Sequence, residues 1–343
     1  MIYAVTKRLM RGALHCYYKQ VRFEGMEHIP RERPVMLLPN HQNALLDPLL
    51  PAAFLPGMRP YFLTRSDVFR GALLQRVFGV FRMLPVYRLR DGRETLGRNQ
   101  AIFERCASLL QQGEPLLLFP EANHNLKRQV RPLSKGFTRI VFRVLSDDPQ
   151  IDLQLVPVGI NYQEGAGFPD RVAFYFGKPI AAAPFLKGGD ESAASRAMCQ
   201  AVFGELTRLT THIPADSDYE ALEATLNAWH PDYLQPAPIN RYLAGEVETV
   251  PDCRVREGFT FRAWDLVFRT VNFPVVLPWK WWVAPRVPEP EFRSTYRFAY
   301  ALLAFPVYYL LLGLILYGWA GATAAGIVLP ALFLHNLLYV KRR

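Results

Sequence analysis

The sequence predicts an α/β domain that continues into a C-terminal hairpin of two transmembrane helices. Residues 34–180 alternate short apolar runs with stretches of helical periodicity, which is typical of a sheet flanked by helices. The 43 residues from Phe298 to Val340 contain no Asp, Glu, Lys or Arg. One membrane span needs about 20 apolar residues, so this run is long enough for two. Hydrophobic residues make up 50% of the 343-residue chain, which is sufficient for a sizeable core.

The charge balance indicates an anionic partner. The formal net charge is +10, which favours nucleic acid, a phosphate-bearing substrate or anionic membrane lipids. The four cysteines are scattered and form no Cys-x-x-Cys pair, so the sequence predicts neither a zinc site nor a disulfide framework. We expect no bound metal and no resident cofactor.

Residues 1–20 predict a basic amphipathic helix at the membrane surface. Apolar residues recur there at helical spacing, whereas Lys7, Arg8 and Arg11 lie off the apolar stripe. The apolar run is too short and too interrupted for a signal peptide. An ordinary surface helix of the following domain would show the same pattern, and the sequence leaves this alternative open.

The main α/β domain is predicted over residues 21–215. Its expected strands are Val35–Leu38, Tyr61–Leu63, Met83–Tyr87, Leu116–Phe119, Leu153–Val158 and Val172–Phe176. Its expected helices are Phe69–Phe78, Glu94–Gln111, Gly136–Leu145 and Ser192–His212.

Residues 216–296 predict a partly helical connector, and residues 297–343 predict the hairpin. The connector begins with an expected helix at Asp218–Ala228, becomes irregular after it, and carries three interfacial tryptophans within Phe273–Pro285. The glycine-rich Gly318–Gly326 is the expected turn between the two spans. Basic residues flank both ends of the hairpin, so we expect an integral membrane protein whose main domain faces the cytoplasm, at the inner membrane in a bacterium. The alternative is a buried core hairpin of a soluble domain.

The segment LLPNHQNALLDPLL places His41 and Asp47 six positions apart after an apolar run. In a continuous helix six steps turn through about 600°, so the two side chains would point about 120° apart. Asp47 precedes Pro48 and therefore suits a helix N-cap, with Pro48 as the first helical residue. The intervening QNALL is then a turn that can fold His41 back over Asp47. Local physics leaves two interpretations open, a base with its orienting carboxylate or a helix cap near an unrelated histidine.

Polar groups and prolines follow several expected strands, at the edge where ligands bind in open α/β sheets. They are Asn40 and His41 after the first strand, Arg88 after the third, Pro120 and Glu121 after the fourth, and Pro157 within the fifth.

Four blocks in this region, NHQNALLDP, LPVYR, FPEANH and VPVGI, resemble in order and spacing the blocks of the PlsC-type glycerolipid acyltransferase family. The blocks span residues 36–160, and FGKPI at Phe176–Ile180 is also similar to the family. The resemblance implies a catalytic domain with a glycerol-phosphate acyltransferase-like sheet flanked by helices. It implies transfer of a fatty acyl group from acyl-CoA or acyl carrier protein to a phosphorylated glycerol acceptor. The expected reaction converts 1-acylglycerol 3-phosphate to phosphatidic acid in phospholipid biosynthesis.

The resemblance also assigns roles to residues. It implies that His41 is the general base and that Asp47 orients it, and it favours Arg88 as the ligand of the acceptor phosphate. Glu121 is expected to bind acceptor hydroxyls or to hold Arg88 in place. The full set of expected substrate-binding residues is Asn40, Arg88, Pro120, Glu121, Lys135 and Pro157.

Two departures from the family pattern bear on the substrate. Five residues separate His41 from Asp47, where the family usually has four; the longer spacing resembles a branch that acylates glycerol 3-phosphate or dihydroxyacetone phosphate. These acceptors, and other lysophospholipids, therefore stay open. Ala122 stands where the family usually has glycine, which costs little unless the backbone takes a positive φ there.

Two other classes of protein compete with this interpretation. A nucleic-acid binder explains the positive charge but not the uncharged C-terminal run, so we expect no nucleic-acid partner. A catalytically silent membrane protein of the same fold is disfavoured because His41, Asp47, Arg88 and Glu121 occur together.

Overall fold

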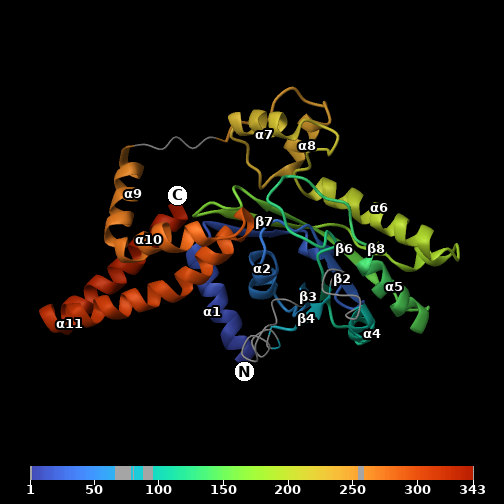
Figure 1. The fold of residues 1–343 in the computed structure, drawn as a ribbon, viewed down its shortest axis with the longest axis horizontal. Helices are drawn as coiled ribbons and strands as arrows, with labels where there is room; N and C mark the ends of the chain where they lie inside the picture. The colour runs from blue at the N-terminus through green and yellow to red at the C-terminus, as the bar shows by residue number, and fades with distance from the viewer. Residues whose placement is uncertain (1, 66–78, 80, 88–95, 254–258, 343) are drawn as a thin grey trace.

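A computed structural model describes residues 2–65, 79, 81–87, 96–253 and 259–342. Within these residues, an eight-stranded mixed sheet has the strand order β1-β7-β6-β2-β5-β3-β4, and β8 pairs with β6. The strands are β1 (Gln20–Glu24), β2 (Val35–Pro39), β3 (Tyr61–Arg65), β4 (Met83–Val86), β5 (Leu116–Leu117), β6 (Gln154–Tyr162), β7 (Arg171–Phe176) and β8 (Ile180–Ala181). The helices of this part are α1 (Ile2–Tyr17), α2 (Leu46–Phe54), α4 (Leu96–Gln111), α5 (Gly136–Asp147), α6 (Glu191–Leu209), α7 (Tyr219–Ala228) and α8 (Pro236–Leu243), as Figure 1 shows.

Strand β2 lies in the middle of the sheet, parallel to both of its neighbours. Its residue Leu37 pairs with Leu117 of β5 and with Val156 of β6. Strands β3 and β4 continue the parallel part, whereas β7 and β8 run antiparallel to β6. Because parallel strands end at the same edge, the residues that follow β2 and β5 are brought together at that edge.

Both faces of the sheet are buried, which gives the domain three layers. Successive residues of a strand point to opposite faces. Val35 and Leu37 pack into a core with α1 and α2, whereas Met36 and Leu38 pack into a second core with α4, α5 and α6. A third, smaller core forms around α7 and α8 between Ile213 and Val250.

The expected α/β sheet flanked by helices is confirmed, and all six expected strands occur with shifted ends. Strands β1 and β8 were not expected. In β1, charged residues alternate with two apolar ones, as an edge strand requires, and β8 has only two residues. Helix α8 lies in a segment that was expected to be irregular, because its two prolines occupy the first turn, where a helix tolerates them. The expected helix Phe69–Phe78 lies outside the described residues.

Gly159 in β6 is required by close packing against the end of α6. A Cβ atom at this position would lie 2.3 Å from the carbonyl oxygen of Leu209. We expect Gly159→Ala to destabilise the fold by about 1–3 kcal/mol, because the two backbones must separate. The measurement is the thermal unfolding midpoint, with Gly204→Ala as the control, since a Cβ there meets nothing within 4 Å. Equal losses in the two variants would contradict this packing.

The C-terminal part contains α9 (Phe259–Val271), α10 (Phe273–Pro278), a π-helical turn at Trp279–Val283, short 3₁₀ turns at Ala284–Arg286 and Pro290–Phe292, and α11 (Arg293–Arg342). Helix α11 is interrupted at Gly321, where φ is 83° and ψ is 175°.

The interruption folds α11 into a hairpin of two arms. Leu329 Cδ1 lies 3.1 Å from the place a Cβ of Gly313 would take, and Asn336 Nδ2 donates to the Tyr309 hydroxyl at 2.9 Å. Figure 1 shows the two arms side by side, meeting at the tip beside the α11 label. Because Gly321 lies within Gly318–Gly326, the expected position of the turn is confirmed.

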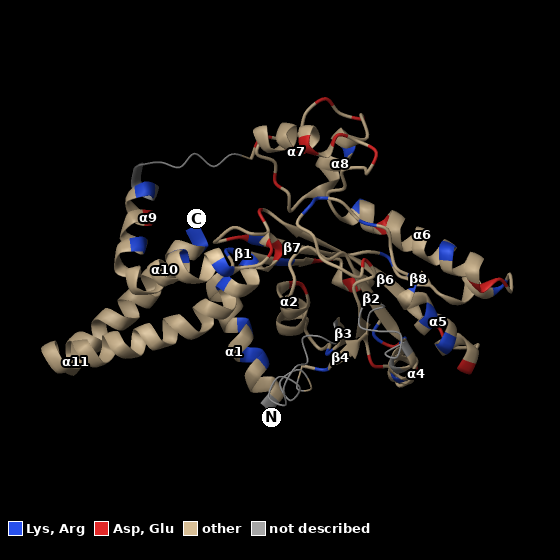
Figure 2. Ribbon diagram, in the orientation of Figure 1, with Lys and Arg blue, Asp and Glu red and all other residues tan. Residues whose placement is uncertain are grey.

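The hairpin has the length and composition of a membrane-crossing segment. The apolar stretch falls within Pro290–Arg342, and its most apolar window has a mean hydropathy of 2.1. None of that window is buried in the structure, so the alternative of a buried core hairpin is wrong. Figure 2 shows both arms without Lys, Arg, Asp or Glu over most of their length, with charges only near the base.

Candidate active site

A tight turn between β2 and α2 brings His41 and Asp47 together. The chain leaves β2 at Pro39, Ala44 takes a left-handed φ of 28°, and α2 begins at Leu46. As a result, His41 Nδ1 lies 2.8 Å from Asp47 Oδ2. The expected turn that folds His41 back over Asp47 is confirmed.

Asp47 does not cap α2, so that part of the prediction is wrong. The N-cap position is Leu45, whose side chain makes no capping hydrogen bond, and Asp47 is already the second helical residue. Its carboxylate points back to the preceding turn and accepts hydrogen bonds from backbone N–H groups there.

The carboxylate of Asp47 is fully buried and saturated with donors. Oδ2 accepts the backbone N–H groups of Gln42 at 2.8 Å and Asn43 at 2.7 Å besides the His41 ring, and Oδ1 accepts the Tyr162 hydroxyl at 2.7 Å. Burial, followed by the neighbouring Asp47 charge, raises the pKa of Tyr162 well above its usual value, so this hydroxyl stays a donor. A buried carboxylate held this way is fixed in position and faces His41 with a defined oxygen.

Two aromatic rings contact the His41 ring. Phe119 stacks on it with ring centroids 4.0 Å apart, and the His124 ring meets it edge-on at 5.4 Å. The His41 side chain is 14% exposed, and Nε2 makes no hydrogen bond to the described part of the chain. With Nδ1 directed at Asp47, the neutral ring has Nε2 available to accept a proton.

Glu121 and Arg131 form an ion pair that hydrogen-bonds the backbone of His41. Glu121 Oε2 accepts the His41 N–H at 3.1 Å and lies 2.5 Å from Arg131 Nη2, while Oε1 accepts the Arg131 N–H at 3.0 Å. Arg131 Nη2 also donates to the His41 carbonyl at 3.2 Å, and the guanidinium bonds Asn123. The pair therefore contacts His41 through its backbone N–H and C=O, from a loop that follows β5.

Arg131 was missed in the sequence because it lies in a loop without periodicity. Glu121 was expected to hold Arg88, and in the described chain the cation that it holds is Arg131. Arg88 lies outside the described residues, so its expected phosphate contact stays a prediction. The same loop carries Lys127, Arg128 and Lys135, and no signal in the sequence singled out Arg131 among them.

Asn40 and Pro157 lie at the site but face the sheet. Asn40 Nδ2 donates to the Ile160 carbonyl at 3.1 Å, and its Oδ1 accepts the Ile160 N–H at 2.6 Å, which ties the end of β2 to β6. Pro157 is buried in β6, and its carbonyl accepts the N–H of Gly177 at 2.9 Å. Contact of either residue with substrate stays a prediction, and for Asn40 it requires one of these bonds to break.

Pro120 and Lys135 lie near the two ends of the loop between β5 and α5. The Pro120 carbonyl accepts the Ser134 N–H at 2.7 Å, and Pro120 itself is buried. Lys135 is exposed at the N-cap position of α5, and its contact with substrate stays a prediction. Among the described residues, no group of three His, Cys, Asp or Glu side chains is arranged to hold a metal ion.

Ala122 adopts the conformation in which alanine is strained. Its φ is 63°, in the left-handed region that favours glycine. We expect Ala122→Gly to stabilise the protein by up to about 1 kcal/mol, because relief of strain exceeds the greater freedom of glycine in the unfolded chain. The thermal unfolding midpoint measures this effect. A lower midpoint would show that the loop is not strained at Ala122.

The loop of residues 163–170, between β6 and β7, connects the active site to the base of the hairpin. The carbonyl of Gly165 accepts Asn43 Nδ2 at 2.8 Å and the Ser294 hydroxyl at 2.7 Å. Arg297 of α11 donates to the carbonyls of Gly167 and Ala166 in the same loop. The turn that carries the candidate base and the start of α11 therefore share one support.

Asp170 lies at the end of this loop and is buried. Burial raises the pKa of the Asp170 carboxyl to about 6, while hydrogen bonds from three backbone N–H groups lower it in part. A pKa above the unfolded value means that protonation stabilises the fold at low pH and that this contribution is lost as the pH rises from about 4 to about 6. Relative to Asp170→Asn, we expect the wild type to lose up to about 3 kcal/mol across this window and to stay constant above it. Thermal unfolding of both proteins between pH 4 and 7 measures this loss. A wild type that gains stability relative to Asp170→Asn as the pH rises would contradict the prediction.

Comparison with known proteins agrees with this geometry. The Acyltransferase family model matches residues 20–161, which include β2, the His41–Asp47 turn and the Glu121–Arg131 pair. This match covers less than half of the chain. The matched region carries every described residue of the candidate site except Tyr162, which follows it directly.

Two individual proteins are similar to the chain. An uncharacterized acyltransferase of Schizosaccharomyces pombe is 26% identical over 141 residues, a match that covers 39% of this chain and only 20% of the yeast protein. The crystal structure of the 1-acyl-sn-glycerophosphate acyltransferase PlsC from Thermotoga maritima aligns with a TM-score of 0.40 and 18% identity, covering 55% of this chain and 72% of that one. The chain therefore spans about a fifth of the length of the yeast relative.

Proposed function

We propose that this protein is a membrane-bound O-acyltransferase that moves a fatty acyl group from an acyl thioester to a hydroxyl of a glycerol-phosphate acceptor. The observation that carries the proposal is the 2.8 Å contact between His41 Nδ1 and the buried Asp47 carboxylate, inside the region that the Acyltransferase family model matches. Acyl transfer to an alcohol needs a base at this point, since a hydroxyl is a poor nucleophile until its proton is removed.

The geometry supports direct transfer without an acyl-enzyme. His41 Nε2 removes the proton of the acceptor hydroxyl while the oxygen attacks the thioester carbonyl. The C–S bond then breaks, and the departing thiolate takes the proton back from the imidazolium. Asp47 fixes the tautomer and stabilises the imidazolium through the Nδ1–H bond. The sequence contains no Gly-x-Ser-x-Gly segment, which disfavours a serine acyl-enzyme.

The remaining groups have supporting roles in this proposal. The Glu121–Arg131 pair positions the backbone of His41, because it bonds both its N–H and its C=O. Arg88 is proposed to bind the acceptor phosphate through a forked contact, and Lys135 to add a donor at the start of α5. The acyl donor is proposed to be acyl-CoA or acyl carrier protein.

The proposed acceptor is 1-acylglycerol 3-phosphate, which gives phosphatidic acid. The five-residue spacing between His41 and Asp47 favours glycerol 3-phosphate or dihydroxyacetone phosphate as a second candidate. Membranes containing the protein should be incubated with a radiolabelled acyl thioester and each of the three acceptors, and the products separated by thin-layer chromatography. We expect a labelled lipid product that depends on one of these acceptors. Release of free fatty acid alone, whatever the acceptor, would overturn the proposal.

We propose that α11 inserts in the membrane with the acyltransferase domain on the cytoplasmic side. The exposed apolar surface of α11 supports insertion, and the basic residues at its base support the orientation. After extraction of membranes at high pH the full chain should stay in the pellet, and proteases added to sealed vesicles should cleave it only from the cytoplasmic side. Recovery of the chain in the supernatant would contradict insertion.

A further inference from the structure

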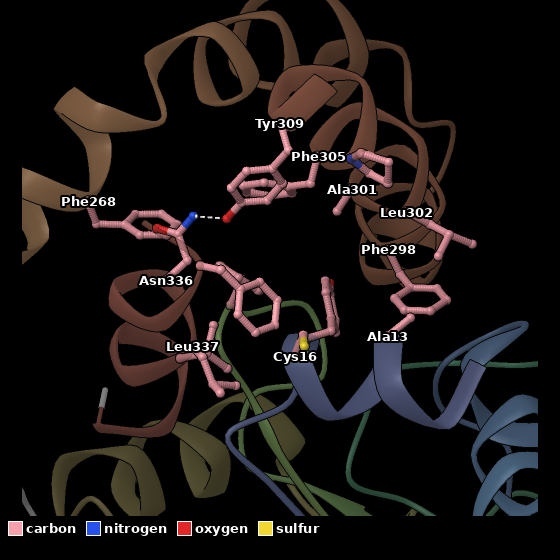
Figure 3. Close-up of a pocket in the computed structure, with 15 residues that line it drawn as sticks. Ala13, Cys16, Phe268, Phe298, Ala301, Leu302, Phe305, Tyr309, Asn336 and Leu337 are labelled. Carbon is pink, nitrogen blue, oxygen red and sulfur yellow. Dashed lines mark hydrogen bonds between the residues drawn. The ribbon is translucent and has the colours of Figure 1, made fainter. Parts of the chain in front are cut away.

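A cavity of about 270 Å³ lies between the base of the α11 hairpin, α1 and α9, away from the acyltransferase site. Figure 3 shows its wall, to which both arms of the hairpin contribute. Its lining includes Ala13, Cys16 and Tyr17 of α1, Phe168, and Ala301 and Phe333 of α11.

The wall of the cavity is apolar, and its polar groups are already paired. Asn336 bonds the Tyr309 hydroxyl and, through both of its amide atoms, Asn272. The Tyr17 hydroxyl donates to the Ser294 carbonyl at 3.3 Å. A buried water needs two to four polar partners, whereas an apolar cavity of about 150 Å³ already takes up a molecule such as benzene. The cavity therefore suits a hydrocarbon and is poorly suited to water.

We propose that this cavity holds one acyl chain of a membrane phospholipid. The inference rests on insertion of α11 in the bilayer and is independent of the acyl-transfer chemistry. The first arm lines the cavity from Phe298 to Tyr309, which is about 16 Å of helix. This length matches the depth of one leaflet, about half of a hydrocarbon core of roughly 30 Å.

The cavity is continuous with the lipid-facing surface of the hairpin. Leu302 and Phe333 line it, yet they are 40% and 49% exposed, so their side chains lie partly on the outside of α11. A lipid chain can therefore enter sideways from the bilayer, between the arms and α1.

Charges at the domain end of the cavity favour an anionic headgroup. Lys341 directly follows the lining residue Val340, and its Nζ lies 3.5 Å from His15 Nδ1, next to the lining residue Cys16. Arg342 follows, with its guanidinium 5.5 Å from the ring centre of Trp264. A chain running down the cavity would place its phosphate beside these cations.

The occupant is a bilayer lipid and not the reacting acyl chain, because aromatic side chains close the cavity toward the acyltransferase domain. Tyr17 is 4% exposed and packs against Phe168 and Phe298 with ring centroids 5.1 and 5.3 Å away. Phe168 belongs to the loop whose Gly165 supports Asn43 beside Asp47. A bound lipid would thus pack against this loop, which in turn supports the His41–Asp47 turn.

The test uses the full chain reconstituted in phosphatidylglycerol vesicles that contain a trace of phospholipid with a photoreactive acyl chain. After illumination, mass spectrometry locates the attached lipid. We expect labelled residues on α1 near Ala13–Tyr17 and on the facing sides of both arms. Ala301→Phe places a ring in the cavity and should reduce this labelling severalfold. Leu303→Phe adds the same ring on the outer face, where Leu303 is 71% exposed, and should leave the labelling unchanged.

Three results would overturn the proposal: equal labelling in both variants, labelling confined to the outer face, or loss of the cavity label when excess acyl thioester or lysophosphatidate is added. The last result would assign the cavity to a substrate chain.

Equal labelling from phosphatidylcholine vesicles would refute the anionic headgroup. If Ala301→Phe fails to fold, Ala13→Leu fills the cavity from α1 and replaces it. A protein that binds the lipid chain but transfers no acyl group would disprove the proposed function alone.

Discussion

His41→Ala is expected to lower the rate of acyl transfer by about 10²–10⁴-fold, the range that a positioned general base contributes. In the wild type, Nδ1 of His41 is held by Asp47, and Nε2 makes no hydrogen bond to the described part of the chain. Alanine removes the proton acceptor and leaves the buried carboxylate without its partner. Initial rates with purified protein, a saturating acyl donor and the active acceptor measure the effect.

A matched control separates loss of the base from loss of the fold. His230→Asn changes an exposed histidine whose φ of 48° asparagine tolerates well, so this variant should keep wild-type activity. Both variants should stay in the membrane fraction and should unfold near the wild-type temperature. A His41→Ala protein that is folded and retains more than about a tenth of the wild-type rate would be too active for the loss of a general base.

Asp47→Asn is expected to lower kcat by about 10²–10⁴-fold with little change in KM. The amide oxygen can still accept from the turn, but the side chain no longer carries the charge that stabilises the imidazolium, and comparable losses follow this change in Ser-His-Asp enzymes. Separate determination of kcat and KM is the measurement, because Asp47 is buried and has no route to the substrate.

Tyr162→Phe is the control for Asp47. It removes only the hydroxyl that donates to Oδ1 at 2.7 Å and leaves the bond between His41 and Oδ2 intact. We expect a loss of about tenfold, as for one hydrogen bond to a charged group. If Asp47→Asn is no more harmful than Tyr162→Phe, the carboxylate serves only to hold the turn, and its support of the base is refuted.

The sequence predicted a turn that can bring His41 and Asp47 together, and the resemblance to the acyltransferase blocks then favoured their contact over a helix cap alone. Two side chains six positions apart in a continuous helix point in different directions, and the proline after Asp47 limits where the helix begins. A turn between His41 and Asp47 was therefore required. The cap was wrong by two residues, because the carboxylate serves the turn before it instead of the helix after it. The N–H groups of the turn and those of the first helical residues both lie within reach of the Asp47 carboxylate, and local propensity cannot decide between them.

Contacts between distant segments could not be predicted in this way. Arg131 reaches Glu121 and His41 across a loop with no periodic pattern, so nothing in the spacing distinguished it from its basic neighbours. Ser294 meets Gly165 across 129 positions, and this contact follows from the docking of α11 on the domain. The apolar hairpin itself was predictable, since composition and the glycine-rich turn suffice to define it. Its contacts with the loop that supports the His41–Asp47 turn were not predictable.

In the proposed mechanism, His41 activates the acceptor hydroxyl for direct attack on the thioester. The measurement is a rapid-quench reaction of purified wild-type protein with acyl donor, with and without acceptor, followed by mass spectrometry of the intact chain. We predict that thiol release requires the acceptor and that the mass of the chain never increases by an acyl group. A burst of thiol without acceptor, together with an acylated chain, would contradict direct attack. The reaction would then proceed through a covalent nucleophile on the protein.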